Sequence, residues 1–329
     1  MDAELEQLGY LGRLMVRLTI GAAQLPEEFQ RKQADYVLSR QLGDGGWPGR
    51  EGHGYEGHSR EGPSREGGSD AYYTSFALRS LAILGLLDGE LAKRCAGFIT
   101  SRVHGHETIV DLLSLVYSAK LIEAACGLDA FASARDGWSQ RLAELLGKLR
   151  RSDGGFSKSL EGQVGSTYQT FLVLLCLELI EQPCPDADAV YQFLLSQRQL
   201  DGGFLEVRVG KRSGTNPTAA AIGALRVLRR LSPDVAEHAA DFFAQRQTDE
   251  GGFQANTRIP LCDVLSTFTA CVTLADIDQL SCISIHGAQH YILSMQQPSG
   301  GFRGFEFDPA DDVEYTFYGL GTLALLNTT

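Results

Sequence analysis

The sequence predicts an all-α fold in which six helical hairpins close into a ring, an α/α toroid that forms a single domain over residues 1–329. Two periodic features predict this fold. A turn made of two glycines and an aromatic residue recurs, with its first glycine at positions 45, 154, 202, 251 and 300. An apolar segment with a central Thr or Ser follows the turn, so each repeat is long enough for two helices.

The glycine turns are expected to end one helix and reverse the chain, because glycine adopts backbone angles that other residues avoid. The last four turns are spaced by 48 or 49 residues, whereas the first gap is 109 residues. The long gap indicates a sixth, degenerate copy near His104 and Gly105. A Gln often precedes the turn, and we expect its side chain to bond free backbone groups at the helix end.

The apolar segments are the predicted inner helices. Apolar residues surround most of each segment, which indicates burial on all sides. The segments align without gaps on Thr74, Ser114, Thr170, Thr218, Thr267 and Thr316. The stretches between them, such as 186–198 and 233–246, are amphipathic and should form an outer ring.

Residues 48–69 break the repeat. They contain seven glycines and few side chains that could pack, which predicts a flexible insertion near one mouth of the ring.

Composition excludes several classes of function. The formal net charge is -12 and no basic stripe is present, which argues against a nucleic-acid partner. The N-terminus lacks the basic stretch and apolar core of a signal peptide, and no apolar run is long enough to span a membrane. The seven cysteines form no CxxC motif and fit free thiols in a reducing compartment. We therefore expect a cytoplasmic protein.

The turns, together with the phrases SDAYYTSFALRSL, STYQTFLVLLCLEL, CDVLSTFTACVTL and DDVEYTFYGLGTLALL, resemble the prenyltransferase and squalene-cyclase repeat superfamily. The resemblance covers nearly the whole chain, from residue 30 to residue 326. It includes protein prenyltransferase β subunits and the β domains of terpene cyclases. It implies an isoprenoid or an isoprenoid diphosphate bound in the centre of the ring.

The prenyltransferase branch implies a catalytic zinc held by an Asp, a Cys and a His. These positions fall on Asp263, Leu265 and Tyr315, so one ligand of three is present and no metal site is expected. Arg258 lies one position from the arginine of that family's diphosphate site and is a candidate substrate-binding residue. The four positions of that site themselves fall on Gly214, Thr257, Pro260 and Ser266.

The terpene-cyclase branch implies a proton-donating Asp in an Asp-x-Asp-Asp-Thr motif. That motif aligns with residues 263–267, where Leu265 takes the donor position. The last repeat, residues 312–316, instead carries Glu314 in this slot. A carboxyl group in an apolar pocket stays protonated more readily and can act as an acid. The candidate catalytic residues are Asp263, Asp312, Glu314 and Tyr315; alternatively, Asp312 only caps its helix and Glu314 faces solvent.

Two further groups of residues have a functional and a structural interpretation. Asp70, Asp263 and Asp312 each precede the aligned Thr by four residues, so they cap helices or ring one mouth, where Mg²⁺ and a diphosphate could bind. Aromatic residues of the inner helices either pack the core or line a wall that binds a polyprenyl chain and stabilises carbocations. They are Tyr72, Tyr73, Tyr168, Phe171, Phe268, Phe317 and Tyr318.

The leading hypothesis is a divergent, zinc-independent isoprenoid-processing enzyme of the prenyltransferase/terpene-cyclase type. Two alternatives stay open. One is a prenyltransferase β-like subunit that needs an α-subunit-like partner. The other is a non-catalytic toroid that binds an isoprenoid or serves as a scaffold.

Overall fold

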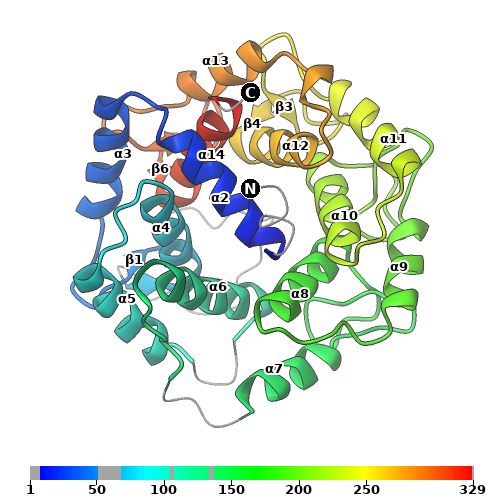
Figure 1. The fold of residues 1–329 in the computed structure, drawn as a ribbon. Coiled ribbons are helices and arrows are strands. Elements are labelled where there is room, and N and C mark those ends of the chain that lie inside the picture. Colours follow the sequence, from blue (N-terminus) through cyan, green and yellow to red (C-terminus); the bar gives the residue numbers. More distant parts are fainter. Residues whose placement is uncertain (1–7, 51–67, 104–106, 133–136, 328–329) are drawn as a thin grey trace.

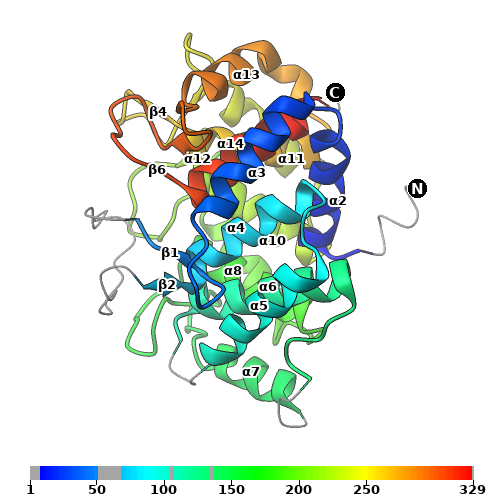
Figure 2. The ribbon, with the colours of Figure 1, turned by 90° about the vertical axis from the view of Figure 1, so that its left-hand side faces the viewer.

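The computed structural model describes residues 8–50, 68–103, 107–132 and 137–327. Figure 1 shows two concentric layers of helices around a common axis, and Figure 2 shows the ring from the side. Each inner helix packs against the next one along the chain, and the last packs against the first, which closes the ring. The inner helices are α4 (Ala71–Ile83), α6 (Ile109–Cys126), α8 (Thr167–Leu179), α10 (Thr215–Val227), α12 (Val264–Asp276) and α14 (Val313–Asn327).

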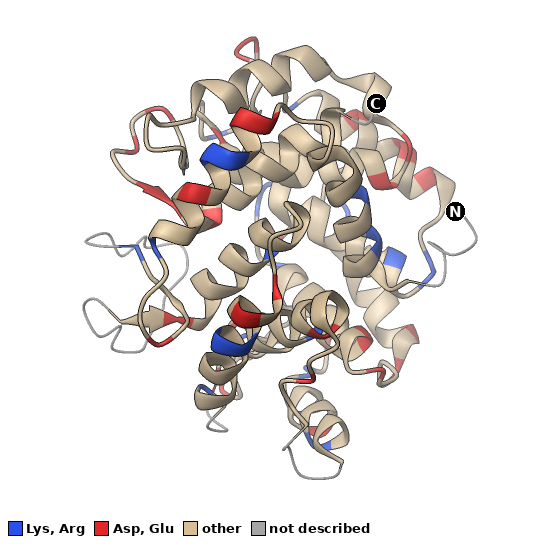
Figure 3. Cartoon of the chain, turned by 60° about the vertical axis from the view of Figure 1, so that its left-hand side comes forward, with Lys and Arg blue, Asp and Glu red and all other residues tan. Residues whose placement is uncertain are grey.

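The outer layer covers the inner one with amphipathic helices. They are α3 (Glu27–Ser39), α5 (Gly89–Ser101), α7 (Trp138–Gly147), α9 (Ala187–Ser196), α11 (Pro233–Ala244) and α13 (Ile285–Ser294), the last preceded by the 3-10 helix η1 (Leu280–Cys282). Most residues of the charged types lie on the outer helices and the loops, and the inner helices carry few of them (Figure 3). The predicted all-α toroid of helical hairpins is confirmed. Among the described residues, no helix is long and apolar enough to cross a membrane.

The threonine on which the repeats align has a definite structural role. Its hydroxyl accepts the backbone N–H of the aromatic residue that ends the preceding glycine turn. In the third repeat, Phe156 N lies 3.0 Å from Thr170 Oγ1. The same bond joins Trp47 to Thr74, Phe204 to Thr218, Phe253 to Thr267 and Phe302 to Thr316. Each bond ties a turn to its inner helix, which explains why the aromatic residue and the threonine recur together.

The first glycine of each turn is required by both conformation and space. Gly251 has φ +91°, and a Cβ there would lie 2.1 Å from the backbone oxygen of Gly287 on α13. Gly300 of the last turn lies in the same way against Lys32 on α3, the first outer helix. The glycine turns therefore join each repeat to the outer helix of the next, and the last turn completes the circle.

Among the described residues, three short antiparallel ladders interrupt the helical pattern at one mouth of the ring. They pair β1 (Trp47–Pro48) with β2 (Ser69–Asp70), β3 (Phe253–Gln254) with β4 (Cys262–Asp263), and β5 (Phe302–Arg303) with β6 (Asp311–Asp312).

The first ladder corrects the predicted insertion at 48–69. Pro48 pairs with Ser69, and the side chain of Arg50 is buried in ion pairs, so both ends of that stretch belong to the ordered ring. Residues 51–67 lie outside the described residues, as do His104 and Gly105 of the predicted sixth turn.

The helix α2 (Tyr10–Ala22) covers the opposite end of the ring. It packs mainly against α14 and α4 and also reaches α10, and it runs across the middle of the ring in Figure 1. The Tyr10 ring meets Phe171 of α8 edge-on, with the ring centroids 5.5 Å apart. The Tyr10 N–H donates to Glu178 near the end of α8, at 2.7 Å. The inner helices therefore end beneath α2 and begin at the mouth that carries the short ladders (Figure 2).

Candidate active site

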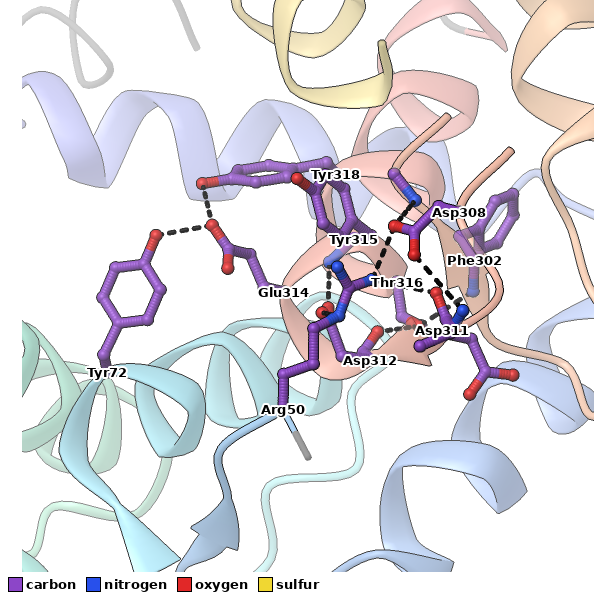
Figure 4. A network of polar contacts seen from close by, with 12 residues as sticks. Arg50, Tyr72, Phe302, Asp308, Asp311, Asp312, Glu314, Tyr315, Thr316 and Tyr318 are labelled. Carbon is purple, nitrogen blue, oxygen red and sulfur yellow. Dashed lines mark hydrogen bonds and ion pairs between the residues drawn. The ribbon is translucent and has the colours of Figure 1, made fainter. Parts of the chain in front are cut away.

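Glu314 lies in the first turn of α14 and forms hydrogen bonds with two tyrosines in the interior of the ring. Its Oε1 accepts a hydrogen bond from the Tyr72 hydroxyl at 2.5 Å and one from the Tyr318 hydroxyl at 3.3 Å (Figure 4). Tyr72 comes from α4, the neighbouring inner helix, and Tyr318 lies one turn further along α14. We call Tyr72, Glu314 and Tyr318 the interior cluster.

The interior cluster faces the axis of the ring. Tyr168 lies on α8, across the ring from α14. Its pKa is raised to about 12, mainly by burial and next by the charge of Glu314, so the two side chains lie close enough to interact across the ring. Burial and the same charge raise the pKa of Tyr72 well above its ordinary value. Tyr72, Tyr168 and Glu314 are nevertheless only half-buried. Their side chains therefore line a part of the interior that solvent still reaches.

An aromatic layer lies next to the interior cluster. The Phe76 ring centroid is 4.8 Å from that of Tyr72, 5.1 Å from that of Tyr318 and 5.7 Å from that of Phe317. Phe268 of α12 lies 5.1 Å from Tyr318 and 5.5 Å from Phe317. These edge-on and tilted rings bring together four predicted wall residues, Tyr72, Phe268, Phe317 and Tyr318, and add Phe76.

Two further predicted wall residues, Tyr73 and Phe171, lie towards the two ends of the ring. Tyr73 meets the Tyr72 ring edge-on at 5.5 Å. A Cβ on Gly49 would lie 3.5 Å from the Tyr73 ring, which places that ring by β1 at the mouth. Phe171 packs against Tyr10 at the end covered by α2.

Asp312 belongs to a different group at the rim, the rim cluster of Arg50, Asp308 and Asp312. Arg50 Nη2 lies 2.7 Å from Asp308 Oδ2, and Arg50 Nε lies 3.0 Å from Asp312 Oδ2, with all three side chains at most 8% exposed. Asp312 Oδ1 also accepts the Tyr315 backbone N–H at 2.8 Å and caps α14. Burial raises the pKa of Asp312, and the Arg50 charge opposes the rise. The predicted capping role of Asp312 is thus present in the structure.

Asp263 caps α12 in the same way. Its carboxylate accepts the Ser266 backbone N–H at 2.6 Å and the Ser266 hydroxyl at 2.8 Å. Burial raises the pKa of Asp263 to about 6. Asp70 likewise accepts N–H groups at the start of α4.

Tyr315 and Arg258 lie outside the interior cluster. The Arg50 guanidinium lies over the Tyr315 ring, 5.3 Å from its centroid, so Tyr315 joins the rim cluster. Burial raises its pKa above the ordinary range, with Glu314 as the next cause. Arg258 is exposed on the loop between β3 and β4. Of the four predicted catalytic residues, the structure places only Glu314 among the inward-facing aromatic side chains.

The residues present do not fit the zinc site of the prenyltransferase branch. Both Asp263 oxygens are engaged by Ser266, and Leu265 and Tyr315 offer no ligand at the other two positions. In the described part of the chain, no three His, Cys, Asp or Glu side chains gather as metal ligands would.

Two inward-facing residues escaped the sequence analysis, Phe76 and Arg79 of α4. Arg79 stands five residues after the aligned Thr74, a position filled in the other repeats only by small or apolar residues: Ala119, Leu175, Gly223, Val272 and Gly321. A single charged residue at a repeat position that is otherwise small or apolar therefore marks Arg79 in the sequence alone.

The family model of the prenyltransferase alpha-alpha toroid domain matches residues 14–329. The chain belongs to this family. No functionally curated protein matches it. Among solved structures, Candida albicans protein geranylgeranyltransferase-I complexed with GGPP is similar, with a TM-score of 0.67, 17% identity, and coverage of 78% of this chain and 84% of that one.

Other similar structures carry different descriptions. The type II terpene cyclase MstE from Scytonema has a TM-score of 0.60 and 14% identity, and the alignment covers 95% of this chain and 98% of the cyclase. A possible member of the GH105 family from Klebsiella pneumoniae has a TM-score of 0.58 and 14% identity, with 92% and 91% covered. Identities this low show the fold alone, so the choice of function among prenyltransferase-like toroids depends on the site.

Proposed function

We propose that this toroid is a zinc-independent isoprenoid-processing enzyme that binds a polyprenyl substrate in its interior and protonates one of its double bonds, with Glu314 as the acid. The observation that carries the proposal is the placement of Glu314 between Tyr72 and Tyr318 beside the aromatic layer. Two of the similar structures support the substrate class, since one is described with GGPP and another, MstE, with geranylgeranyl dihydroxybenzoate.

The proposed step is a general-acid protonation. The Glu314 O–H bond breaks, its proton forms a C–H bond with one alkene carbon, and the π-electron pair of that alkene leaves a cation on the other carbon. Glu314 becomes a carboxylate, which the Tyr72 and Tyr318 hydroxyls stabilise by hydrogen bonds. A further double bond attacks this cation and forms a new one, which finally loses a proton to solvent water and leaves a neutral alkene.

The aromatic layer suits the cation that this step creates. Aromatic faces attract a cation within about 6 Å of the ring centroid. Phe76, Phe268, Phe317 and Tyr318 carry no charge and are buried, so little water lies against their rings to quench the cation. Burial of apolar surface also supplies the affinity for a polyprenyl chain.

The test is product analysis in heavy water. The purified protein is incubated in D₂O with farnesyl diphosphate, geranylgeranyl diphosphate or squalene, with and without Mg²⁺, and extracts are analysed by mass spectrometry. A cyclised product that carries one deuterium from the acid is expected. Glu314→Gln should lower turnover by about 10²- to 10⁴-fold, because an amide cannot donate this proton.

Glu178→Gln is the matched control. Glu178 is also a half-buried glutamate of an inner helix, but it bonds Tyr10 at the covered end of the ring. Its replacement should leave turnover within about twofold. Turnover that survives Glu314→Gln would contradict the assigned acid. Substrates that bind without any product would indicate a binding toroid instead of an enzyme.

A further inference from the structure

Arg79 is a cation in the interior of the ring, enclosed by aromatic rings. It lies near the middle of α4. Its guanidinium carbon is 4.5 Å from the ring centroid of Phe76, 4.5 Å from that of Tyr117 on α6, and 5.8 Å from that of Phe317 on α14. Three inner helices therefore surround this charge.

Arg79 has no anionic partner in the described part of the chain. None of the ion pairs found there includes it, although Arg40, Arg50, Arg102, Arg150, Arg198, Arg226 and Arg230 each pair with an Asp. Its Nε is buried and lacks a hydrogen-bond acceptor. Charged groups inside proteins are as a rule paired, because removing a charge from water is costly. Contacts with ring faces offset only part of that cost.

Arg79 and Glu314 lie at different depths along the axis of the ring, so a ligand that contacts both has a defined orientation. The two side chains form no ion pair, yet both act electrostatically on Tyr168 and on Tyr318, so both face the same interior space. Tyr72, which bonds Glu314, precedes Arg79 by seven residues on the same face of α4. Seven residues of α-helix span roughly 10 Å along its axis. Arg79 is therefore the deeper of the two groups, on the side of α2.

We propose that Arg79 binds an anionic group of the ligand, a carboxylate or a phosphate, deep in the ring. This inference depends on the proposed binding of an isoprenoid in the interior but not on its protonation. The planar guanidinium presents a fork of N–H donors that matches both kinds of anion, and ligand oxygens would satisfy the buried Nε. The charged head then lies towards α2, and Glu314 faces double bonds remote from that head.

The test compares three C20 ligands that differ only in their head: geranylgeranoic acid, geranylgeranyl diphosphate and the neutral alcohol geranylgeraniol. Binding is measured by titration calorimetry without Mg²⁺. The unaltered protein should bind at least one anionic ligand about tenfold or more tightly than the alcohol, since a charge-assisted hydrogen bond favours binding by this order. The acid and diphosphate arms distinguish the two sources of anion.

Arg79→Met should abolish the preference and leave affinity for the alcohol within about threefold. Arg79→Lys keeps the charge without the fork and should retain part of the preference. Arg246→Met is the matched control, because Arg246 also lies over a ring, 5.4 Å from the Phe242 centroid, but follows an outer helix. Thermal unfolding of each variant shows whether the ring is intact; should Arg79→Met fail to fold, the partial loss in Arg79→Lys carries the test.

Equal affinity for all three ligands, or a preference that persists in Arg79→Met, would overturn the inference while leaving isoprenoid binding intact. Failure of every ligand to bind would overturn both proposals. A preference that vanishes in Arg79→Met but remains in a catalytically unaffected Glu314→Gln protein would support the anion site and reject the acid.

Discussion

Two acids two residues apart at the start of α14 lie in opposite environments. Asp312 points into the rim cluster, where it pairs with Arg50 and caps the helix. Glu314 points into the ring, where its oxygen accepts two tyrosine hydroxyls. Figure 4 shows both on one turn of helix, directed away from each other. Successive helical residues are rotated by about 100°, so residues two apart point to different faces.

The comparison separates stabilising acids from a candidate catalytic one. The carboxyl groups of Asp312 and Asp263 are occupied by the helix ends they cap, and the Asp312 carboxyl also by an ion pair. Glu314 accepts hydrogen bonds from Tyr72 and Tyr318, and these hydroxyls would stabilise the carboxylate after it gives up a proton. We expect substitutions at the rim to change stability and substitutions in the interior cluster to change chemistry.

Asp312→Ala should have the largest effect on folding. It removes one of the two carboxylates that pair with Arg50 and the cap of α14, at an expected cost of about 2–4 kcal/mol in the free energy of unfolding. Urea denaturation measures the loss. The control is Asp234→Ala, which breaks the more exposed pair with Arg198 and should cost at most about 1 kcal/mol. Equal losses in the two variants would remove the distinction between rim and surface acids.

Asp263 should make stability depend on pH. Its folded-state pKa of about 6 lies above the ordinary 3.8, so the folded protein binds this proton more tightly than the unfolded chain. The free energy of unfolding should therefore fall as pH rises from 4 to 6, by about 1–2 kcal/mol for this partly exposed group. Asp263→Asn should flatten that part of the profile, as followed by denaturation at pH 4, 5, 6 and 7. An unchanged slope would show that Asp263 is not the titrating group.

The smallest effect is expected on the pH profile of turnover, when either tyrosine that bonds Glu314 is replaced by Phe. The Tyr72 hydroxyl donates a hydrogen bond that stabilises the Glu314 carboxylate, so Tyr72→Phe should move the upper midpoint of the turnover profile to higher pH. Tyr318→Phe removes the longer bond and should raise the midpoint less. Profiles of kcat against pH for both variants check this order. A downward move in either would contradict an acid role for Glu314.

The repeat by itself determined the ring. Glycines at fixed spacing, an aligned threonine and alternating apolar and amphipathic segments specify hairpins that bury their apolar faces only against neighbouring hairpins. The turn glycines and the threonine hydroxyls make local contacts, or contacts with the adjacent repeat, and such contacts recur with the period of the sequence.

Tertiary structure alone decided which side chains meet across the ring. The contacts of Tyr72 with Glu314 and of Arg50 with Asp312 join residues separated by 242 and 262 positions, and no periodicity reports such pairs. The sequence placed Asp263, Asp312, Glu314 and Tyr315 in one candidate site because all lie near helix starts. In the folded ring these residues point in different directions, because one turn of helix presents neighbouring residues to different surroundings. Closure of the ring brought Arg79 and Glu314 to one interior.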